Sequence, residues 1–364
     1  METKLIVTKR NEAYVKVNCE RSTAQELSEF FTFYVPGHQF TPAFRNKIWD
    51  GKIRLFDLRT FQVYHGLLPY IENFCEEREY TLEYGDPRPD LTEDYSVYHA
   101  DKFITDLELQ SRNNDIDVRD YQKNAYVHAM RNKRCLLLSP TSSGKSLIIY
   151  LAVRQLLTYK CKKGLIIVPT TSLVEQLYSD FADYSTKNGW DVQENVHRIY
   201  QGRDKNTELP LTISTWQSLY TQPEEYFHQF DFIIGDEAHL FKAQSLVSIM
   251  SNCINAKYRI GLTGTLDGTK THKLVLEGLF GPVEKVTTTK ELMNNKQIAD
   301  FSIKCLVLKH DDEICQLMKG KTYQEEIEYL ILNESRNKFI KNLAVSLNGN
   351  SLILYQYVDK HGKI

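Results

Sequence analysis

At two places in this chain a short polar segment follows an apolar run, and the residue types suit phosphate chemistry. The first is "SPTSSGKS", Ser139 to Ser146, which leads into the apolar stretch "LIIYLAV". A loop of this type that opens a helix points backbone N–H groups at phosphate oxygens, while Lys145 would reach the β- and γ-phosphates and the Ser146 hydroxyl would bind Mg²⁺. The rest of the cradle would be Thr141, Ser142, Ser143 and Gly144. Gly-Lys-Ser also occurs in ordinary surface turns, and Ser139 stands where such loops usually begin with glycine.

The second segment is "FIIGDEAH", Phe232 to His239, in which an apolar strand would deliver two adjacent acids at its carboxyl end. Asp236 would hold Mg²⁺ through its waters, and Glu237 would orient and deprotonate an attacking water. Two acids after a strand are also typical of a solvated turn. Because the phosphate loop, the alternating elements and the acidic strand end occur in this order, we expect an enzyme that hydrolyses ATP with Mg²⁺.

Composition limits the remaining possibilities. The 364 residues, 42% hydrophobic and 25% charged, suffice for two or three folded domains. A formal net charge of −2 excludes a globally basic nucleic-acid binder, so contacts with a polyanion must come from local patches. The seven cysteines include no CxxC pair, and no apolar run reaches the ~20 residues of a membrane helix. We therefore expect a soluble, intracellular protein with reduced cysteines and no membrane partner.

The pattern of apolar residues predicts three folded parts. Strand and helix patterns up to a Pro- and Asp-rich stretch at 85–92 indicate a small α+β unit. Beyond it, short continuous apolar runs alternate with helix-length segments, which is typical of a doubly wound α/β domain with a parallel sheet. A strand at 302–308, a helix at 323–347 and a strand at 351–358 would begin another α/β domain. The predicted division is a small α+β substrate-binding domain at 1–90, a linker at 91–112, an ATP-binding domain at 113–287 and an incomplete further domain at 288–364.

Six segments resemble, in the same order, the motifs of superfamily 2 helicases and translocases. Besides the two described above, they are "RDYQ" at 119–122, "VPTTSLVEQ" at 168–176, "ISTWQSL" at 213–219 and "LTGTL" at 262–266. The resemblance implies that 113–287 is a RecA-like motor domain and that 288–364 begins a second one. It also implies that Arg119 and Gln122 read the adenine, with Gln122 pairing the edge of the base.

Further roles follow from the same resemblance. Thr170, Thr171 and Thr215 would grip nucleic-acid phosphates, and their positions after strand ends suit contact without base readout. Thr171 or Ser172 would alternatively only cap a helix, with Glu175 reaching back. The residues that would couple hydrolysis to motion are His239, Thr263 and Thr265. The alternative for His239 is an interior histidine with satisfied hydrogen bonds and no coupling role. Thr263 and Thr265 likewise have either a coupling role or a structural one.

A larger set of segments, including "FRNKIWDGKIRLFD", "PTSSGKS" and "KGKTYQEEI", resembles a group of helicases of T-even bacteriophages over the whole chain. That resemblance implies a motor on branched or forked DNA, acting in fork regression, branch migration and R-loop unwinding during phage recombination, replication and repair. We expect a monomer in the cytoplasm of the infected bacterium. RNA–DNA hybrids stay open as substrates, because the motifs grip phosphates and no reader of the 2′-hydroxyl is identifiable. The direction of tracking also stays open.

The segment 44–59, "FRNKIWDGKIRLFDLR", mixes basic and aromatic residues, which suits a duplex backbone and an exposed base step. The predicted DNA contacts within it are Arg45, Lys47, Lys52 and Arg54. Residues 1–100 as a whole contain 12 basic and 16 acidic residues. A half-buried hairpin with a solvated charged face is therefore the alternative.

Three functions are distinct at this point. The favoured one is a nucleic-acid-stimulated ATPase of the helicase class. In superfamily 2 the arginine that stabilises the transition state comes from the far end of the second motor domain, and no such motif follows "LILYQYVDKHGK". The second hypothesis is therefore a truncated nucleotide- and DNA-binding module without unwinding activity. A restriction-type motor with a fused nuclease is disfavoured, because residues 1–110 contain no nuclease-like cluster of paired acids and a lysine.

Overall fold

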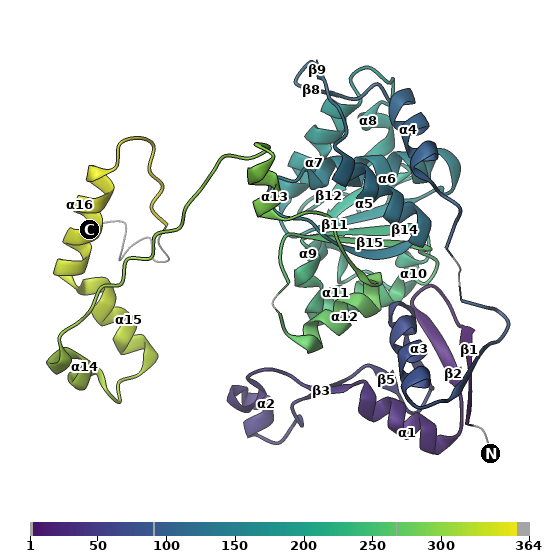
Figure 1. Cartoon of the computed structure of the whole chain (residues 1–364), viewed down its shortest axis with the longest axis horizontal. Coiled ribbons are helices and arrows are strands. Elements are labelled where there is room, and N and C mark those ends of the chain that lie inside the picture. Colours follow the sequence, from purple (N-terminus) through teal and green to yellow (C-terminus); the bar gives the residue numbers. More distant parts are fainter. Residues whose placement is uncertain (1–2, 90–91, 267, 355–364) are drawn as a thin grey trace. The chain divides into compact units, whose positions relative to one another are not determined.

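The structure is a computed structural model that describes residues 3–89, 92–266 and 268–354. The chain divides into two compact units, Met1–Ala299 and Asp300–Ile364. The first unit contains a large and a small β-sheet with their helices, and the described part of the second unit contains three helices joined to irregular segments (Figure 1). No helix among the described residues combines the length and the apolar character needed to span a membrane.

A seven-stranded sheet with parallel pairing throughout forms the centre of the first unit, in the order β12-β13-β11-β14-β15-β10-β16. Its strands are β10 (Arg134–Leu138), β11 (Gly164–Val168), β12 (Val196–Ile199), β13 (Leu211–Thr215), β14 (Phe232–Asp236), β15 (Tyr258–Thr263) and β16 (Val283–Lys285). Strands β11, β13 and β15 are buried along their whole length, because helices cover both faces. The predicted doubly wound parallel sheet is confirmed. The edge strands β12 and β16 were not predicted, because their sequences "VHRI" and "VEK" contain no continuous apolar run.

Helices lie on both faces of this sheet (Figure 1). One face carries α4 (Val97–Asp106), α5 (Asp120–Asn132), α6 (Lys145–Tyr159), α7 (Thr171–Tyr184) and α8 (Val192–Asn195). The other face carries α9 (Trp216–Leu219), α10 (Glu224–Phe227), α11 (Gln244–Asn252) and α12 (Lys270–Phe280). The short helices η3 (Ala238–Lys242) and α13 (Thr289–Asn294) follow β14 and β16. The segment predicted as a linker, 91–112, contains α4, whose Ala100 and Phe103 are buried in the same core as α5 and α6.

A buried arginine fixes the ends of two of these helices. Arg259, on β15, is 1% exposed. It donates hydrogen bonds to the carbonyl oxygens of Met250 (2.7 Å) and Cys253 (2.8 Å) at the end of α11, and of Leu279 (3.3 Å) at the end of α12. Burial, followed by the nearby Arg134 charge, lowers the pKa of Arg259 to about 10. The guanidinium therefore remains a cation that satisfies the free carbonyls at both helix ends.

The small domain is built on a mixed five-stranded sheet in the order β5-β6-β2-β1-β7. Its strands are β1 (Lys4–Lys9), β2 (Tyr14–Asn18), β5 (Phe56–Asp57), β6 (Gln62–Tyr64) and β7 (Thr81–Tyr84). The sheet packs against α1 (Arg21–Phe30) and α3 (Leu68–Glu77), with the short helix η2 (His65–Leu67) before α3. Strands β1 and β2 pair antiparallel as a hairpin, and β1 also pairs in parallel with β7. The small α+β domain is thus confirmed.

The small domain shares one hydrophobic core with the α11–α12 face of the large sheet. At Gly66 the approach is so close that an added Cβ would lie 2.0 Å from the carbonyl oxygen of Glu277. The Glu12 carboxylate lies 2.6 Å from Lys9 Nζ and 2.7 Å from Arg134 Nη2, at the start of β10. A buried ionic bridge and a packed backbone contact therefore hold the two sheets together.

A ribbon projects from the small domain (Figure 1). It consists of β3 (Thr32–Tyr34) and β4 (Lys52–Arg54), which pair antiparallel, with η1 (His38–Phe40) and α2 (Pro42–Arg45) between them. We call residues 32–54 the basic tip. A second short ribbon, β8 (Gln110–Ser111) and β9 (Asn114–Asp115), precedes α5.

The second unit contains α14 (Asp312–Met318), α15 (Tyr323–Leu332) and α16 (Glu334–Ser346). The single helix predicted at 323–347 is wrong, because the chain breaks at Asn333, whose side-chain oxygen accepts a hydrogen bond from Arg336 N (2.8 Å) and caps α16. The strand predicted at 302–308 is not formed. No other strand in the described part of this unit supplies a ladder partner, and an unpaired strand has no hydrogen bonds to hold it. Of the strand predicted at 351–358, residues 351–354 are not extended in a sheet and 355–358 lie outside the described residues.

Candidate nucleotide-binding site

The motif residues meet at one edge of the large sheet. The phosphate loop follows β10, Thr170 follows β11, and Asp236 and Thr263 are the last residues of β14 and β15. Because all these strands are parallel, their carboxyl ends lie along the same edge, where α/β sheets bind their ligands. The fold therefore brings together segments that are more than a hundred residues apart in the sequence.

Two serines close the phosphate loop on itself. Ser139 Oγ and Ser143 Oγ are 2.6 Å apart, and Ser143 Oγ also donates to the carbonyl oxygen of Pro140 (2.7 Å). Both serines are buried, whereas Thr141 and Ser142 are exposed. Ser139, which stands where glycine is usual, thus has a structural partner that the sequence pattern did not predict.

The loop presents free hydrogen-bond donors. Gly144 (φ +78°) is left-handed and α6 begins at the next residue. Ser142 is also left-handed, with φ +65°. Within the described chain, no intramolecular hydrogen bond is formed by the backbone N–H groups of Thr141, Ser142, Gly144, Lys145 and Ser146. Such a cradle at the start of a 15-residue helix fits the oxygens of a polyphosphate.

The buried side chain of Gln122 holds the phosphate loop through hydrogen bonds. It is 4% exposed, and its Nε2 donates to the carbonyl oxygen of Ser143 (2.8 Å) while its Oε1 accepts from Arg119 N (3.0 Å). Tyr121 OH donates to the same carbonyl (3.0 Å) and accepts from Arg119 Nη1 (2.9 Å). A Cβ on Gly144 would lie 2.3 Å from Gln122 Nε2, so this contact also requires glycine. The structure gives Gln122 and Arg119 a role in positioning the loop, and adenine recognition stays a prediction.

The predicted catalytic charges contact one another. Lys145 Nζ lies 3.2 Å from Glu237 Oε1, and Glu237 has a left-handed backbone with φ +50°. Asp236 Oδ1 accepts a hydrogen bond from Glu237 N (3.0 Å). Burial raises the pKa of Asp236, and the Lys145 charge opposes that rise. Lys145 is thus paired with the residue that is predicted to activate water. A bound phosphate would compete with Glu237 for the Lys145 charge.

The donor set fits Mg²⁺ bound together with a nucleotide. A divalent cation beside Asp236 would favour the ionised carboxylate that burial disfavours. No group of three or more His, Cys, Asp or Glu within the described ranges is placed to hold a metal ion. Mg²⁺ would therefore take one or two protein oxygens and complete its shell with phosphate oxygens and water, which is its usual behaviour in nucleotide sites.

Ser146 has a partner that no motif indicates. Its Oγ lies 2.9 Å from the hydroxyl of Tyr184, the last residue of α7. Burial raises the pKa of Asp180, also on α7, and interaction with the Ser146 side chain opposes that rise. These two residues follow Ser146 by more than thirty positions and match no known spacing, so sequence reasoning had no signal for them.

The predicted coupling residues form a chain that begins at Glu237. His239 Nδ1 lies 3.4 Å from Glu237 Oε2 and 3.0 Å from Thr263 Oγ1. Thr263 Oγ1 donates to the carbonyl oxygen of Thr265 (2.9 Å). Because the threonine proton is used in that bond, His239 must donate from Nδ1 to Thr263. The structure thus connects Lys145, through Glu237, to the loop after β15.

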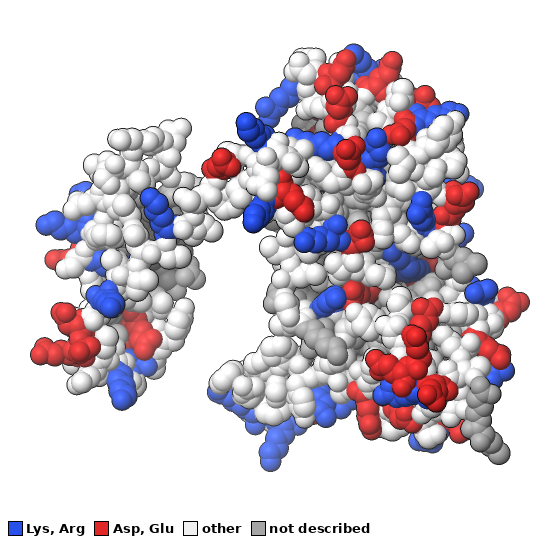
Figure 2. Space-filling model, viewed as in Figure 1, with Lys and Arg blue, Asp and Glu red and all other residues white. Residues whose placement is uncertain are grey.

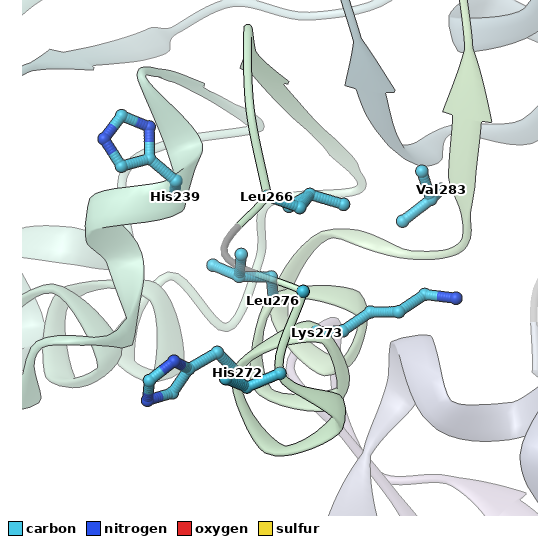
Figure 3. A pocket seen from close by; sticks show the side chains of 8 residues that line it. His239, Leu266, His272, Lys273, Leu276 and Val283 are labelled. Carbon is cyan, nitrogen blue, oxygen red and sulfur yellow. The ribbon is translucent and has the colours of Figure 1, made fainter. Parts of the chain in front are cut away.

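A cavity of about 380 Å³ lies beside His239 (Figure 3). Leu266, Leu276 and Val283 make much of its wall, with His272 and Lys273 at the start of α12. Lys273 Nζ lies 3.7 Å from Glu277 Oε1. This apolar wall lacks the backbone donors of the phosphate loop, so the cavity is not the triphosphate site.

The three predicted phosphate-gripping threonines differ in exposure. Thr170 and Thr171 are exposed at the start of α7, and Thr170 Oγ1 caps the helix by accepting from Leu173 N (3.3 Å). The cap is therefore neither Thr171 nor Ser172. Glu175 does not reach back but pairs with Arg198 (2.5 Å). Capping leaves the Thr170 hydroxyl free to donate to a phosphate.

Thr215 differs from the expectation. It is 5% exposed, and its Oγ1 lies 3.0 Å from Ser218 Oγ. Its side chain faces the start of α9 because the two hydroxyls satisfy each other there. The structure does not place the Thr215 hydroxyl on the surface for a phosphate.

The basic tip concentrates positive charge. Residues 32–54 contain four basic and one acidic residue, whereas the rest of residues 1–100 contains 8 basic and 15 acidic residues. Figure 2 shows Lys and Arg gathered over α2 and β3, while Asp and Glu gather over the body of the small domain. Lys52 Nζ lies 4.9 Å from the centre of the Tyr34 ring, and Arg54 pairs with Asp50. The tip also exposes the apolar side chains of Tyr34, Phe40 and Ile48.

Comparison with known proteins agrees with this geometry. Residues 5–84 match the family model described as the N-terminal domain of the DNA helicase UvsW, and 115–268 match the res subunit of type III restriction enzymes. The ATP-dependent DNA helicase uvsW of Enterobacteria phage T4 is 37% identical over 358 residues, 96% of this chain and 70% of that protein. The DNA 3'-5' translocase XPB2 of Sulfurisphaera tokodaii is 27% identical over 202 residues, 54% of this chain and 42% of that protein.

Solved structures agree as well. A crystal structure of the UvsW helicase from bacteriophage T4 has a TM-score of 0.71 at 36% identity and covers 78% of this chain and 100% of that chain. A second T4 UvsW structure has a TM-score of 0.72 at 35% identity, covering 95% and 67%. Fold and site define an ATP-hydrolysing motor of helicase superfamily 2. Within it, the chain belongs to the UvsW family of DNA helicases. ATP and a divalent metal follow from that membership.

Proposed function

We propose that this chain couples Mg²⁺-ATP hydrolysis to movement on branched DNA, in fork regression, branch migration and R-loop unwinding. The observation that supports this best is the meeting of the free loop donors, the Lys145–Glu237 pair and the exposed Thr170 at one sheet edge. Membership of the UvsW family supports a role in phage recombination, replication and repair, in the cytoplasm of the infected bacterium.

The ion pair gives the nucleotide step an order. Lys145 would leave Glu237 for the β- and γ-phosphates, and Glu237 would then be free to accept a proton from water. Ser146 and Asp236 would hold Mg²⁺, which neutralises the developing phosphate charge. His239 faces both Glu237 and Thr263. When Lys145 leaves Glu237 for phosphate, the contacts of the loop that ends in Thr265 would therefore change as well. Water activation is therefore tied to nucleotide binding by side chains of this chain.

The DNA contacts fall into two groups. Thr170 and Thr171 stand exposed at the start of a 14-residue helix, where backbone donors and the helix dipole favour a phosphate. The basic tip would hold the duplex backbone through Arg45, Lys47, Lys52 and Arg54, and its exposed Phe40 would meet an unstacked base. The contrast between a basic tip and an acidic domain body favours this over a merely solvated hairpin.

A second candidate concerns the activity of the 364-residue chain by itself. Among its described residues the second unit forms no strand and exposes apolar side chains, among them Ile303 (80%), Val307 (81%), Leu352 (85%) and Leu354 (84%). We infer that the alternative to the motor is a protein that binds nucleotide and DNA without separating strands.

The deciding experiment measures phosphate release with and without forked DNA, and strand separation in parallel. The motor function predicts DNA-stimulated hydrolysis with strand separation, whereas the binding module predicts nucleotide binding with neither. Fork unwinding would refute the binding-module function, its absence in a folded protein that binds nucleotide would refute the motor function, and nicking of a supercoiled plasmid with Mg²⁺ would point to a nuclease.

A further inference from the structure

The hydroxyl contact between α6 and α7 concerns the serine that is predicted to bind the metal. Ser146 is the second residue of α6, and its Oγ lies 2.9 Å from Tyr184 OH. Tyr184 ends α7, and its ring packs edge-on against the ring of Tyr150 with centroids 5.4 Å apart. Packing against Tyr150 thus fixes the Tyr184 ring and holds its hydroxyl beside Ser146.

The surrounding contacts make this part of the helix pair rigid. Tyr150, one turn after Ser146, lies 2.7 Å from Ser185 Oγ through its own hydroxyl, and Asn188 Nδ2 donates to the same phenol oxygen (3.1 Å). Tyr150 and Ser185 are buried. Because these bonds join α6 to the end of α7 at successive positions, Tyr184 has little freedom to leave Ser146.

We propose that Tyr184 is a positioning residue that sets the rotamer of Ser146 for Mg²⁺, an inference that rests on the proposed nucleotide site. A serine hydroxyl has one proton and two lone pairs. When a lone pair binds Mg²⁺, the proton still needs an acceptor, and Tyr184 OH lies where it can accept that proton. Partners of this kind orient the metal ligand, and their loss typically costs 10–100-fold in metal affinity.

The position of Tyr184 on α7 has a further consequence. The same helix begins after Thr170, the predicted phosphate contact, and its 14 residues span roughly 21 Å. DNA held at the first end of α7 would therefore reach the metal ligand through one rigid element. We expect this coupling to be favourable, and because coupling between two sites is reciprocal, DNA and Mg²⁺ would then strengthen each other's binding by the same factor.

The test is a titration of nucleotide binding against Mg²⁺ for Tyr184→Phe, with ADP carrying a fluorescent label. Phenylalanine keeps the ring against Tyr150 and removes only the hydroxyl. We expect the Mg²⁺ midpoint to rise about 10–100-fold, whereas labelled ADP in EDTA binds as in the unaltered protein. Forked DNA should lower the midpoint of the unaltered protein and have little effect on the variant's. The matched control is Tyr178→Phe on the same helix, whose ring lies under Arg198 (3.8 Å) and whose hydroxyl is not at Ser146.

Each other outcome has a definite meaning. An unchanged Mg²⁺ midpoint in a folded Tyr184→Phe protein overturns the inference and makes Tyr184 a packing residue. A lower midpoint also overturns it, because Tyr184 would then withhold the hydroxyl from the metal. If forked DNA leaves the midpoint of the unaltered protein in place, the coupling through α7 is refuted. If the unaltered protein shows no Mg²⁺-dependent nucleotide binding, the proposed function itself fails.

Discussion

Replacing Glu237 with glutamine tests whether nucleotide binding must break an ion pair. The Lys145 and Glu237 side chains are 14% and 31% exposed, and their charged atoms are 3.2 Å apart. Opposite unit charges at this separation attract by roughly 5 kcal/mol at an effective dielectric constant of about 20, and by roughly 1 kcal/mol in water. Both groups also lose hydration when they pair, so the net interaction lies toward the lower value. The net interaction between Lys145 and Glu237 is therefore about 1–2 kcal/mol.

Glutamine keeps the shape of the side chain and removes its charge. Lys145 is then free for phosphate, so we expect Mg²⁺-ATP to bind about 5–30-fold more tightly, which corresponds to the same 1–2 kcal/mol. Hydrolysis should nevertheless slow by on the order of 10²-fold or more, because an amide does not take a proton from water. Tighter binding with slower turnover is the signature of a base that also competes for the phosphate lysine.

Two measurements suffice, a nucleotide titration for Kd and phosphate release at saturating nucleotide with forked DNA. The matched control is Glu175→Gln, which removes the same charge from the pair with Arg198 on the surface of α7 and should leave both values near those of the unaltered protein. Weaker nucleotide binding in Glu237→Gln would show that the carboxylate holds the metal or the loop. Unchanged turnover would show that another group activates the water.

Three other predictions follow from the site and the fold. Lys145→Ala should abolish ATP turnover without changing the circular dichroism spectrum, since the ammonium acts only where phosphate charge accumulates; normal turnover by the folded variant would remove Lys145 from the site. Glu12→Ala should lower the free energy of unfolding in urea by about 3–5 kcal/mol, because it leaves the Arg134 charge buried, whereas Glu83→Ala, in an exposed pair with Lys4, should cost about 0–1 kcal/mol; equal losses would contradict the buried bridge. Neutralising four residues of the basic tip together should weaken forked-duplex binding and lower its salt slope by up to about four ions, and an unaltered slope would favour a solvated hairpin. Those residues are Arg45, Lys47, Lys52 and Arg54.

The sequence predicted the frame of the site because local rules determine it. A continuous apolar run such as "CLLLS" is stable as a buried parallel strand, and the loop after it must then open at the carboxyl edge of the sheet. The same rule places Asp236 and Thr263 at that edge. Each of these positions depends on one strand and its immediate neighbours, so a single sequence is enough.

Side-chain partners far apart in the sequence were not predictable in this way. Nothing in "GKS" indicates that Ser146 meets Tyr184, and nothing in "YRIGLTGT" shows that Arg259 would be buried rather than solvated. Thr215 was expected at the surface from its motif, but its hydroxyl has Ser218 as a closer partner. The strand expected at 302–308 has suitable residues, yet a strand exists only with a partner. These differences arise from tertiary contacts, on which residue pattern carries no information.

The attachment of the small domain to the large sheet determines whether nucleotide binding can move the basic tip. Glu12 anchors the small domain at Arg134 and through its own N–H at the carbonyl oxygen of Ile254, and Arg134 begins β10 at the amino edge of the large sheet. The nucleotide site lies at the carboxyl edge, five residues further along the same strand, or roughly 17 Å away. Removing one partner of a buried ion pair costs about 3–5 kcal/mol, so the bridge at Glu12 does not open easily. The contacts given above for Glu12 include no residue that phosphate or Mg²⁺ would displace. Nucleotide binding therefore has no means to release the tip, which must travel with the sheet as a fixed projection. A motion that ATP drives would then leave the tip in place on the large sheet, and the tip would hold the DNA against which that motion acts.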